Sequence, residues 1–221
     1  EITRWTMPEH LSTLNPLTAN SAYEWQVLDL IYDRLIEQNP CTHELIPWVA
    51  SDLPTLEEWT GPNGELGTHM YFQMREGLRW HDGEPVTAAD AVFCLDLNRF
   101  QQVERYRSTW EPIYDVKQTG TYTWEVWYLQ RYYFAARAVG GLGFMTPKHL
   151  WENWIGPVKS PTGPFGSDVW TGWVNSHTQW YGWEWAHPGT TAYPNLGTSD
   201  TYNGYADMGL TQLIGFGPFI Y

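Results

Sequence analysis

Two segments of this chain have residue types and spacings that could do chemistry. Gly140-Gly141-Leu142-Gly143 has the closely spaced glycines of a phosphate-binding loop. Its glycines do not complete the G-x-G-x-x-G pattern of a dinucleotide-binding loop, however, because the third glycine of that spacing is missing, and no clear strand precedes it. His81 and Asp82 place an imidazole next to a carboxylate, and both groups can bind a metal ion. The sequence Asp82-Gly83-Glu84-Pro85, however, is more typical of a turn than of metal ligands.

Three carboxylates could supply the catalytic pair of a glycoside hydrolase. If folding brought two of Glu57, Glu58 and Asp90 together across a cleft, one could act as an acid and the other as a base or nucleophile. The chain has no Gly-x-Ser-x-Gly, His-Glu-x-x-His or Walker sequence. We therefore expect no catalytic residue, no metal site and no cofactor, with a tryptophan-rich glycoside hydrolase or an adhesive surface module as alternatives.

The elements that would position these residues are clearest between residues 71 and 100. The alternation over 71–75 predicts a strand with Phe72 and Met74 on one face. After the turn, Thr87 and Asp90 have the spacing of a capping box, which predicts a helix start. An apolar stripe extends this helix to about residue 99.

The remaining periodicities predict a mixture of strands and helices without a regular βαβ rhythm. We expect a strand over residues 2–7, a helix over 21–35, hairpin arms over 53–60 and 68–75, and a second hairpin over 113–117 and 122–129. We also expect a short helix over 134–139, stopped by Gly140-Gly141, and another that starts at Thr146-Pro147.

Composition narrows the classes of partner. The chain has 221 residues and a formal net charge of -13, which argues against nucleic acid or an anionic membrane surface as a partner. It has no run of 18 apolar residues. The two cysteines, Cys41 and Cys94, do not have zinc-site spacing. Cys94 lies on the predicted helix and is expected to be a buried thiol; a Cys41–Cys94 disulfide is the alternative.

Aromatic residues are unusually abundant, with 15 Trp and 14 Tyr. Seven of the tryptophans fall between residues 151 and 185, in a segment also rich in Gly, Pro, Ser and Thr. In one interpretation these rings hold a loop-rich subdomain together. In the other, some of them line a cleft and stack on sugar rings or peptide side chains.

Four segments match one family signature in the same order along the chain. They are Leu14-Asn15-Pro16 followed by Ile31-Tyr32-Asp33-Arg34-Leu35, Leu45-Ile46-Pro47-Trp48-Val49-Ala50-Ser51, Y-F-x-x-R-E-G-L-R-W-H-D-G-E-P-V-T-A-A-D-A-V-F over 71–93, and Gly215-Phe216-Gly217-Pro218-Phe219. Together they resemble the family-5 extracellular solute-binding proteins, the dipeptide, oligopeptide and nickel receptors of ABC importers. Asn15 and Phe216 depart from the Asp and Thr that the family usually has.

The resemblance implies a mixed α/β fold, namely a type II periplasmic-binding-protein first lobe that is incomplete without the C-terminal lobe. We expect residues 1–221 to be an N-terminal fragment of a longer, two-lobe protein. About 1–50 and 205–221 would belong to the core sheet, about 51–150 would form a subdomain with the signature strand–turn–helix, and about 151–204 would be a Trp-rich irregular insertion.

The resemblance also implies capture of a solute without chemistry. The expected protein is a monomeric, extracytoplasmic component of an ABC importer, periplasmic or on the cell surface, with or without a lipid anchor. It would bind peptides between two lobes and deliver them to a membrane permease, with oligosaccharides as an alternative ligand. The expected ligand contacts are Asn20, Ser21 and Ala22, which follow the Leu14-Asn15-Pro16 motif, and Tyr106, Trp110, Phe144, Met145 and Phe216 in the cleft wall.

Overall fold

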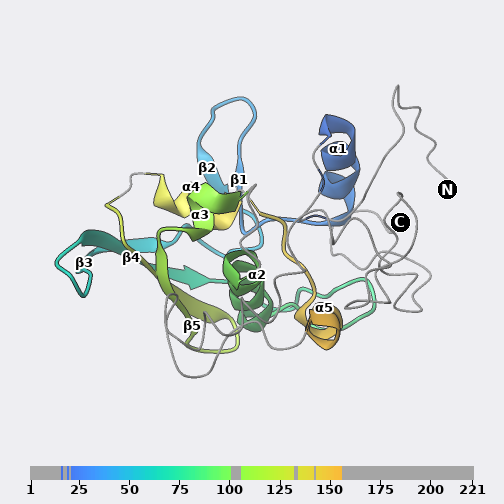
Figure 1. Ribbon diagram of the computed structural model, residues 1–221. Helices are drawn as coiled ribbons and strands as arrows, with labels where there is room; N and C mark the ends of the chain where they lie inside the picture. Colours follow the sequence, from blue (N-terminus) through green and yellow to red (C-terminus); the bar gives the residue numbers. More distant parts are fainter. Residues whose placement is uncertain are drawn as a thin grey trace.

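The computed structural model describes residues 21–100, 106–131, 134–141 and 143–155, together with Pro16 and Ala19 (Figure 1). The predictions made for residues 2–7, for Asn20 and for 156–221, which include Phe216 and most of the Trp-rich segment, lie outside these residues. The described part has a mixed α/β fold.

A four-stranded antiparallel sheet forms the centre of the described part. Its strand order is β3-β4-β6-β5, with β3 (Thr55–Thr60), β4 (Leu66–Gln73), β5 (Ile113–Gln118) and β6 (Thr123–Tyr128). The pairs β3–β4 and β5–β6 confirm the two predicted hairpins. In the first turn Gly64 has a φ of 88°, a left-handed conformation that glycine adopts without steric cost.

The two faces of the sheet differ as the sequence alternation predicts. Phe72 and Trp124 are buried on one face, where their rings stack at 4.3 Å with an interplanar angle of 8°. On the other face the His69 ring lies between Tyr71, at 4.2 Å, and Trp127, at 4.4 Å. The strand β3 lies at an edge of the sheet, and most of its side chains are exposed.

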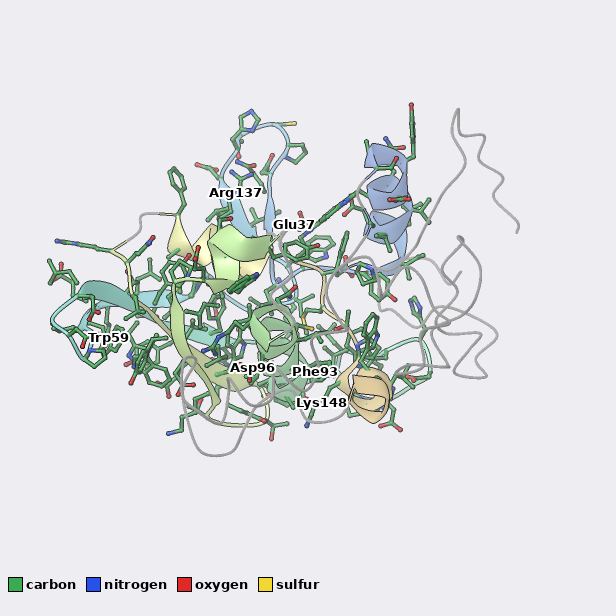
Figure 2. All side chains as sticks on the ribbon, viewed as in Figure 1. Glu37, Trp59, Phe93, Asp96, Arg137 and Lys148 are labelled. Atoms are coloured by element: carbon green, nitrogen blue, oxygen red, sulfur yellow. The ribbon has the colours of Figure 1, made fainter. Side chains whose placement is uncertain are left out.

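The helix α2 (Ala88–Phe100) packs against β5 and β6 (Figure 1). It begins where the sequence predicts, after a turn in which Gly83 has a φ of 92°. The buried guanidinium of Arg99 donates to Asp96 at 3.1 Å and to the carbonyl of Tyr114, on β5, at 3.0 Å. Figure 2 shows Asp96 on this helix, so an ion pair lies inside the interface between helix and sheet.

The remaining elements are shorter. A second, two-stranded sheet is formed by β1 (Ile36–Gln38) and β2 (Leu45–Pro47). The short helices are α1 (Ala22–Ile31), α3 (Arg107–Trp110), α4 (Ala135–Gly141) and α5 (Lys148–Ile155). None of the described helices is long and apolar enough to cross a membrane.

The predicted helix over 21–35 is too long by one turn. The helix α1 ends at Ile31, and Tyr32 is extended, with φ -116° and ψ 150°. The apolar residues Leu35 and Ile36 continue the 3.6-residue periodicity by chance, because both are buried at the entrance to β1 rather than on a helix face. The prediction for α4 was also wrong at its end, since Gly140 and Gly141 lie within the helix instead of stopping it.

Candidate functional site

The chain just after the Leu14-Asn15-Pro16 motif is held by two aromatic side chains. The hydroxyl of Tyr106 donates to the carbonyl of Pro16 at 3.0 Å. The indole nitrogen of Trp25, on α1, donates to the carbonyl of Ala19 at 3.2 Å. Because an aromatic ring has few rotatable bonds, these two contacts fix the backbone that precedes the expected ligand-contact segment.

That segment ends in a complete capping box. Ser21 accepts a hydrogen bond from the amide of Tyr23 at 3.3 Å, and the Ser21 amide donates to Glu24 at 2.9 Å. These contacts satisfy donors that a helix start otherwise leaves free. Ala22, the first residue of α1, is exposed, whereas Ser21 is half-buried. Ala22 therefore offers the accessible surface at this helix start, and Asn20 lies outside the described residues.

An aromatic cluster lies beside α1 and contains Phe144 at its centre. The Phe144 ring is 4.9 Å from the ring of Trp25 and 6.0 Å from that of Tyr32, and Trp25 meets Tyr106 edge-on at 6.5 Å. The guanidinium of Arg34 lies 4.3 Å from the Phe144 centroid, within cation–π range. Sequence reasoning missed Trp25 and Arg34, although Trp25 already lay on the predicted helix.

Arg34 is held in place by two carboxylates. Its guanidinium is 2.6 Å from Asp29 on α1 and 3.0 Å from Glu37 on β1. The charge of Arg34 is thus balanced by two carboxylates, and one face of its guanidinium lies on an aromatic ring. Arg34 therefore links the helix α1, the strand β1 and the aromatic cluster. It is therefore a structural cation rather than a free anchor for an anionic ligand.

The segment 143–147, here called the strap, connects α4 to α5 and carries two of the expected cleft residues. Both Phe144 and Met145 are buried. The thiol of Cys94, on α2, accepts a hydrogen bond from the amide of Thr146 at 2.9 Å. Burial raises the pKa of Cys94 to about 12, so this side chain is a neutral thiol. The prediction of a buried free thiol is confirmed, because Cys41 is exposed and also free.

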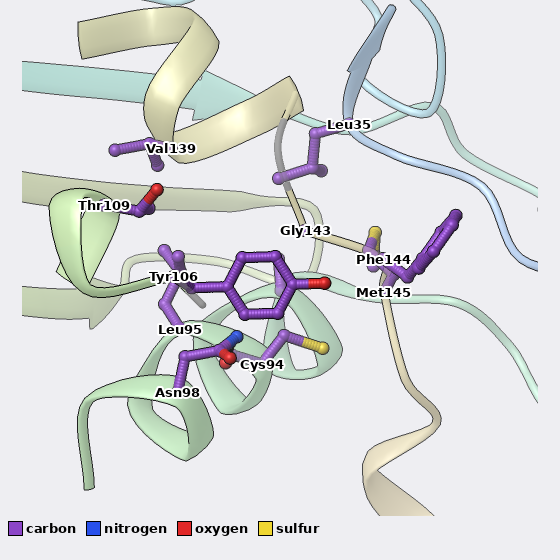
Figure 3. Close-up of a pocket in the computed structure, with 11 residues that line it drawn as sticks. Leu35, Cys94, Leu95, Asn98, Tyr106, Thr109, Val139, Gly143, Phe144 and Met145 are labelled. Carbon is purple, nitrogen blue, oxygen red and sulfur yellow. Dashed lines mark hydrogen bonds between the residues drawn. The ribbon is translucent and has the colours of Figure 1, made fainter. Parts of the chain in front are cut away.

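A small cavity of about 20 Å³ lies between the strap and α2 (Figure 3). Tyr106, Phe144 and Met145 contribute to its wall, so the structure brings three expected residues together. Trp110 is buried outside the lining, and Ser21 and Ala22 lie at the start of α1. The cavity is far smaller than a peptide side chain requires, and these aromatic residues present a packed wall rather than an open pocket.

The glycines of α4 serve close packing rather than phosphate binding. A Cβ atom at Gly140 would lie 2.7 Å from the side chain of Ile36 on β1. Glycine at this position therefore permits α4 to approach the two-stranded sheet. At Gly141 the added atom would be 3.3 Å from the carbonyl of Ile36.

The carboxylates considered for catalysis have separate structural contacts. Glu57 accepts a hydrogen bond from the hydroxyl of Tyr71 at 3.2 Å. Glu58, the next residue on β3, pairs with Arg131, and both side chains are largely exposed. Since successive side chains of a strand point to opposite faces, Glu57 and Glu58 do not face each other across a cleft.

Asp90 is committed to helix capping. Its Oδ2 accepts from the amide and hydroxyl of Thr87 at 2.8 and 3.2 Å, and its Oδ1 accepts from the amide of Lys148 at 3.0 Å. Asp82 accepts from the amide of Glu84 and pairs with His149 at 2.7 Å. The predicted turn role of Asp82 is thereby confirmed. Within the described residues no group of three or more His, Cys, Asp or Glu side chains could hold a metal ion.

Comparisons with known proteins agree with this architecture. No protein-family model matches the chain. The periplasmic murein peptide-binding protein MppA of Escherichia coli (strain K12) is 26% identical over 113 residues, which are 51% of this chain and 16% of that protein. A periplasmic oligopeptide-binding protein of Thermotoga maritima is 25% identical, with a TM-score of 0.50, over 65% of this chain and 25% of that one.

A second solved structure extends the fold match. The oligopeptide-binding protein from Thermus thermophilus, complexed with a pentapeptide, superimposes with a TM-score of 0.52 at 21% identity, over 62% of this chain and 24% of that one. The matches thus span a quarter or less of the length of these relatives. The relatives in E. coli and T. maritima are periplasmic binding proteins. In sequence and in fold, the described part of the chain is thus similar to part of these periplasmic binding proteins.

Proposed function

We propose that this chain is part of the extracytoplasmic solute-binding component of an ABC importer, and that the ligand is a peptide. The observation that carries the proposal is the 26% identity to a murein peptide-binding protein over half of the chain. The T. maritima relative, an oligopeptide-binding protein at 25% identity with the same fold, supports it. The resemblance seen in the sequence supplies the class of transporter.

The proposed mode of binding uses backbone more than side chains. An extended peptide would lie beside residues 20–22 and pair, as added strands do, with main-chain groups on either side of Ser21. The amide and carbonyl of Ser21 itself are already bonded to Glu24 and to the amide of Trp25. Ala22 is exposed and has a short side chain, so a ligand can approach the backbone at this point. The aromatic rings of Tyr106 and Phe144 are buried and contact Trp25 on α1, so they would support this segment from behind.

The whole protein would capture its ligand by closing two lobes. A ligand that contacts both lobes shifts the population toward the closed form, and the permease would bind that form. This chain would supply part of the first lobe and would bind weakly alone, since the facing wall belongs to the second. No bond of the ligand is made or broken in this cycle.

The experiment is a calorimetric titration of the intact protein that contains this chain with tri- to pentapeptides. Ala22→Trp should weaken peptide binding at least tenfold by covering the backbone, whereas Gln26→Trp, one helical turn further along α1, should leave it within twofold. Mass spectrometry of the natively purified protein should reveal co-purified peptides. If neither peptides nor an effect of Ala22→Trp is found, the proposal fails.

A second candidate ligand is an oligosaccharide. One structure of an oligopeptide-binding protein of T. maritima, which matches this chain at 24% identity and a TM-score of 0.50, contains mannohexaose. The 15 Trp residues of this chain suit stacking on sugar rings. Titration of the intact protein with mannohexaose beside the peptides separates the two candidates, because the preferred class should bind at least tenfold more tightly.

A further inference from the structure

Two polar side chains line the cavity between α2 and the strap, and the proposed peptide binding does not involve them. Asn98 on α2 and Thr109 on α3 both line it (Figure 3). Asn98 is 7% exposed and Thr109 is 6% exposed, so bulk solvent does not solvate them. Their side chains are nonetheless polar, in a wall that is otherwise formed largely by Leu, Ala, Val and aromatic residues.

One atom of each side chain lacks a hydrogen-bond partner within the described part of the chain. These atoms are the amide oxygen of Asn98 and the hydroxyl oxygen of Thr109. The amide nitrogen of Asn98 donates to the carbonyl of Cys94 at 2.8 Å, and this contact leaves the oxygen as a free acceptor. Buried polar atoms of folded proteins are almost always paired with protein or with ordered water.

The size of the cavity decides which ligand can satisfy them. Its volume is about 20 Å³. A water molecule needs roughly 10–15 Å³ measured in this way, so the space suits one water and excludes an amino-acid side chain. Cavities that stay empty are apolar, whereas this one is lined by two residues, Asn98 and Thr109, that each have an unpaired polar atom.

We propose that this cavity is a buried hydration site, in which ordered water supplies the missing partners of Asn98 and Thr109. The site joins the signature helix α2 to α3 and to the strap. Tyr106, directly before α3, donates a hydrogen bond to the carbonyl of Pro16. By stabilising α3, the water would therefore also stabilise this contact with the chain that precedes the expected ligand-binding residues. This proposal does not depend on the identity of the transported solute.

The variant Thr109→Val separates a hydrated cavity from a dry one by the sign of its effect. It keeps the shape of the side chain and removes the hydroxyl. If water binds there, the change removes one of its partners and the Tm should fall by about 2–4 °C. If the cavity is dry, the change removes an unsatisfied buried hydroxyl, and the Tm should stay the same or rise.

Thr68→Val provides the matched control. Thr68 is also buried, and its hydroxyl donates to the carbonyl of Gln130 at 3.1 Å, so its loss should lower the Tm in either case. A crystal structure of the unsubstituted chain should show water density within hydrogen-bond distance of the Asn98 amide oxygen or the Thr109 hydroxyl. An unchanged or raised Tm in Thr109→Val, or a cavity without water density, overturns the proposal. If Thr109→Val does not fold, the density decides alone.

Discussion

The carboxylate of Asp90 lies 3.0 Å from the backbone nitrogen of Lys148, 58 residues further along the chain. Its other oxygen accepts from the amide of Thr87 at 2.8 Å. One side chain therefore satisfies amide donors at the starts of both α2 and α5. Helix starts leave such donors unpaired, so this contact ties the signature helix to the last described one.

The first prediction concerns the loss of this double cap. Asp90→Ala removes acceptors at two helix starts, and we expect the free energy of unfolding to fall by about 2–3 kcal/mol, more than the usual loss of about 1 kcal/mol for one cap. Urea denaturation followed by circular dichroism measures it. The exposed Asp52→Ala is the control and should change stability by less than about 0.5 kcal/mol. Equal losses in the two variants would contradict the double cap.

The second prediction concerns pH. Burial raises the pKa of Asp90 above its ordinary value of 3.8, although its hydrogen bonds from Thr87 and Lys148 oppose this shift. A folded-state pKa above the unfolded one means that the folded chain binds more protons in this range. The contribution of Asp90 to stability is therefore greatest below pH 3.8 and is lost as the pH rises through the higher folded value.

Comparison with Asp90→Asn isolates this contribution from that of other carboxyl groups. The stability of the unsubstituted chain minus that of Asp90→Asn should decrease as the pH rises from about 3 to about 7. Urea unfolding at several pH values measures the difference. An increase over the same range would show that the hydrogen bonds outweigh burial and that the pKa of Asp90 is lowered.

The third prediction is that the two cysteines differ in reactivity. Cys41 is exposed, whereas Cys94 is buried with its pKa raised to about 12. Only the thiolate is strongly nucleophilic, so a thiol reagent should modify one cysteine per folded chain and two in urea. Cys41→Ser should abolish the reaction of the folded chain, and Cys94→Ser should preserve it. Rapid modification of both thiols without denaturant would contradict the buried position of Cys94.

The fourth prediction compares a buried ion pair with an exposed one. Asp96→Asn removes the negative charge that balances the buried guanidinium of Arg99. We expect the free energy of unfolding to fall by about 3–5 kcal/mol. Glu58→Gln breaks the exposed pair with Arg131 and should cost less than about 1 kcal/mol. Urea unfolding of both variants gives the two values. A similar small cost for each would mean that water reaches Arg99.

The fifth prediction tests the contact between α4 and β1. Gly140→Ala places a methyl group against Ile36 and should destabilise the fold by about 1–3 kcal/mol. Ile36→Val should relieve part of this cost in the double variant. At Gly143 no atom lies within 4 Å of an added Cβ, so Gly143→Ala should be neutral or slightly stabilising. Thermal unfolding of the four variants measures the coupling; a neutral Gly140→Ala would contradict close packing.

Local patterns predicted the hairpins and α2, because alternation, turn residues and capping are encoded within a few neighbouring positions. The end of α1 was not predictable in this way. Leu35 and Ile36 fit a helical stripe, and only their burial at β1 shows that the chain is extended there. The glycines of α4 predict a helix stop from sequence alone, because the residue that explains them, Ile36, lies about a hundred positions away along the chain.

The candidate site shows the same limit. The resemblance brought Tyr106, Phe144 and Met145 forward, and the structure places them around one cavity. It did not indicate Arg34, whose position depends on Asp29, Glu37 and an aromatic ring from a distant segment. The sequence does not indicate that Asn98 and Thr109 are buried, because polar residues of helices are usually exposed to solvent. Only the packing of the folded chain shows that these two are buried.

The edge position of β3 has a consequence for behaviour at high concentration. Among the residues that the structure describes, no strand pairs with the outer side of β3. The amides and carbonyls of such an edge strand can pair with a strand of a neighbouring molecule. Two adjacent acidic residues, Glu57 and Glu58, lie in the middle of this border. Glu58 is paired with Arg131, so in an approaching copy it is the Glu57 carboxylate that would meet a like charge. We expect this repulsion to oppose edge-to-edge stacking at high concentration.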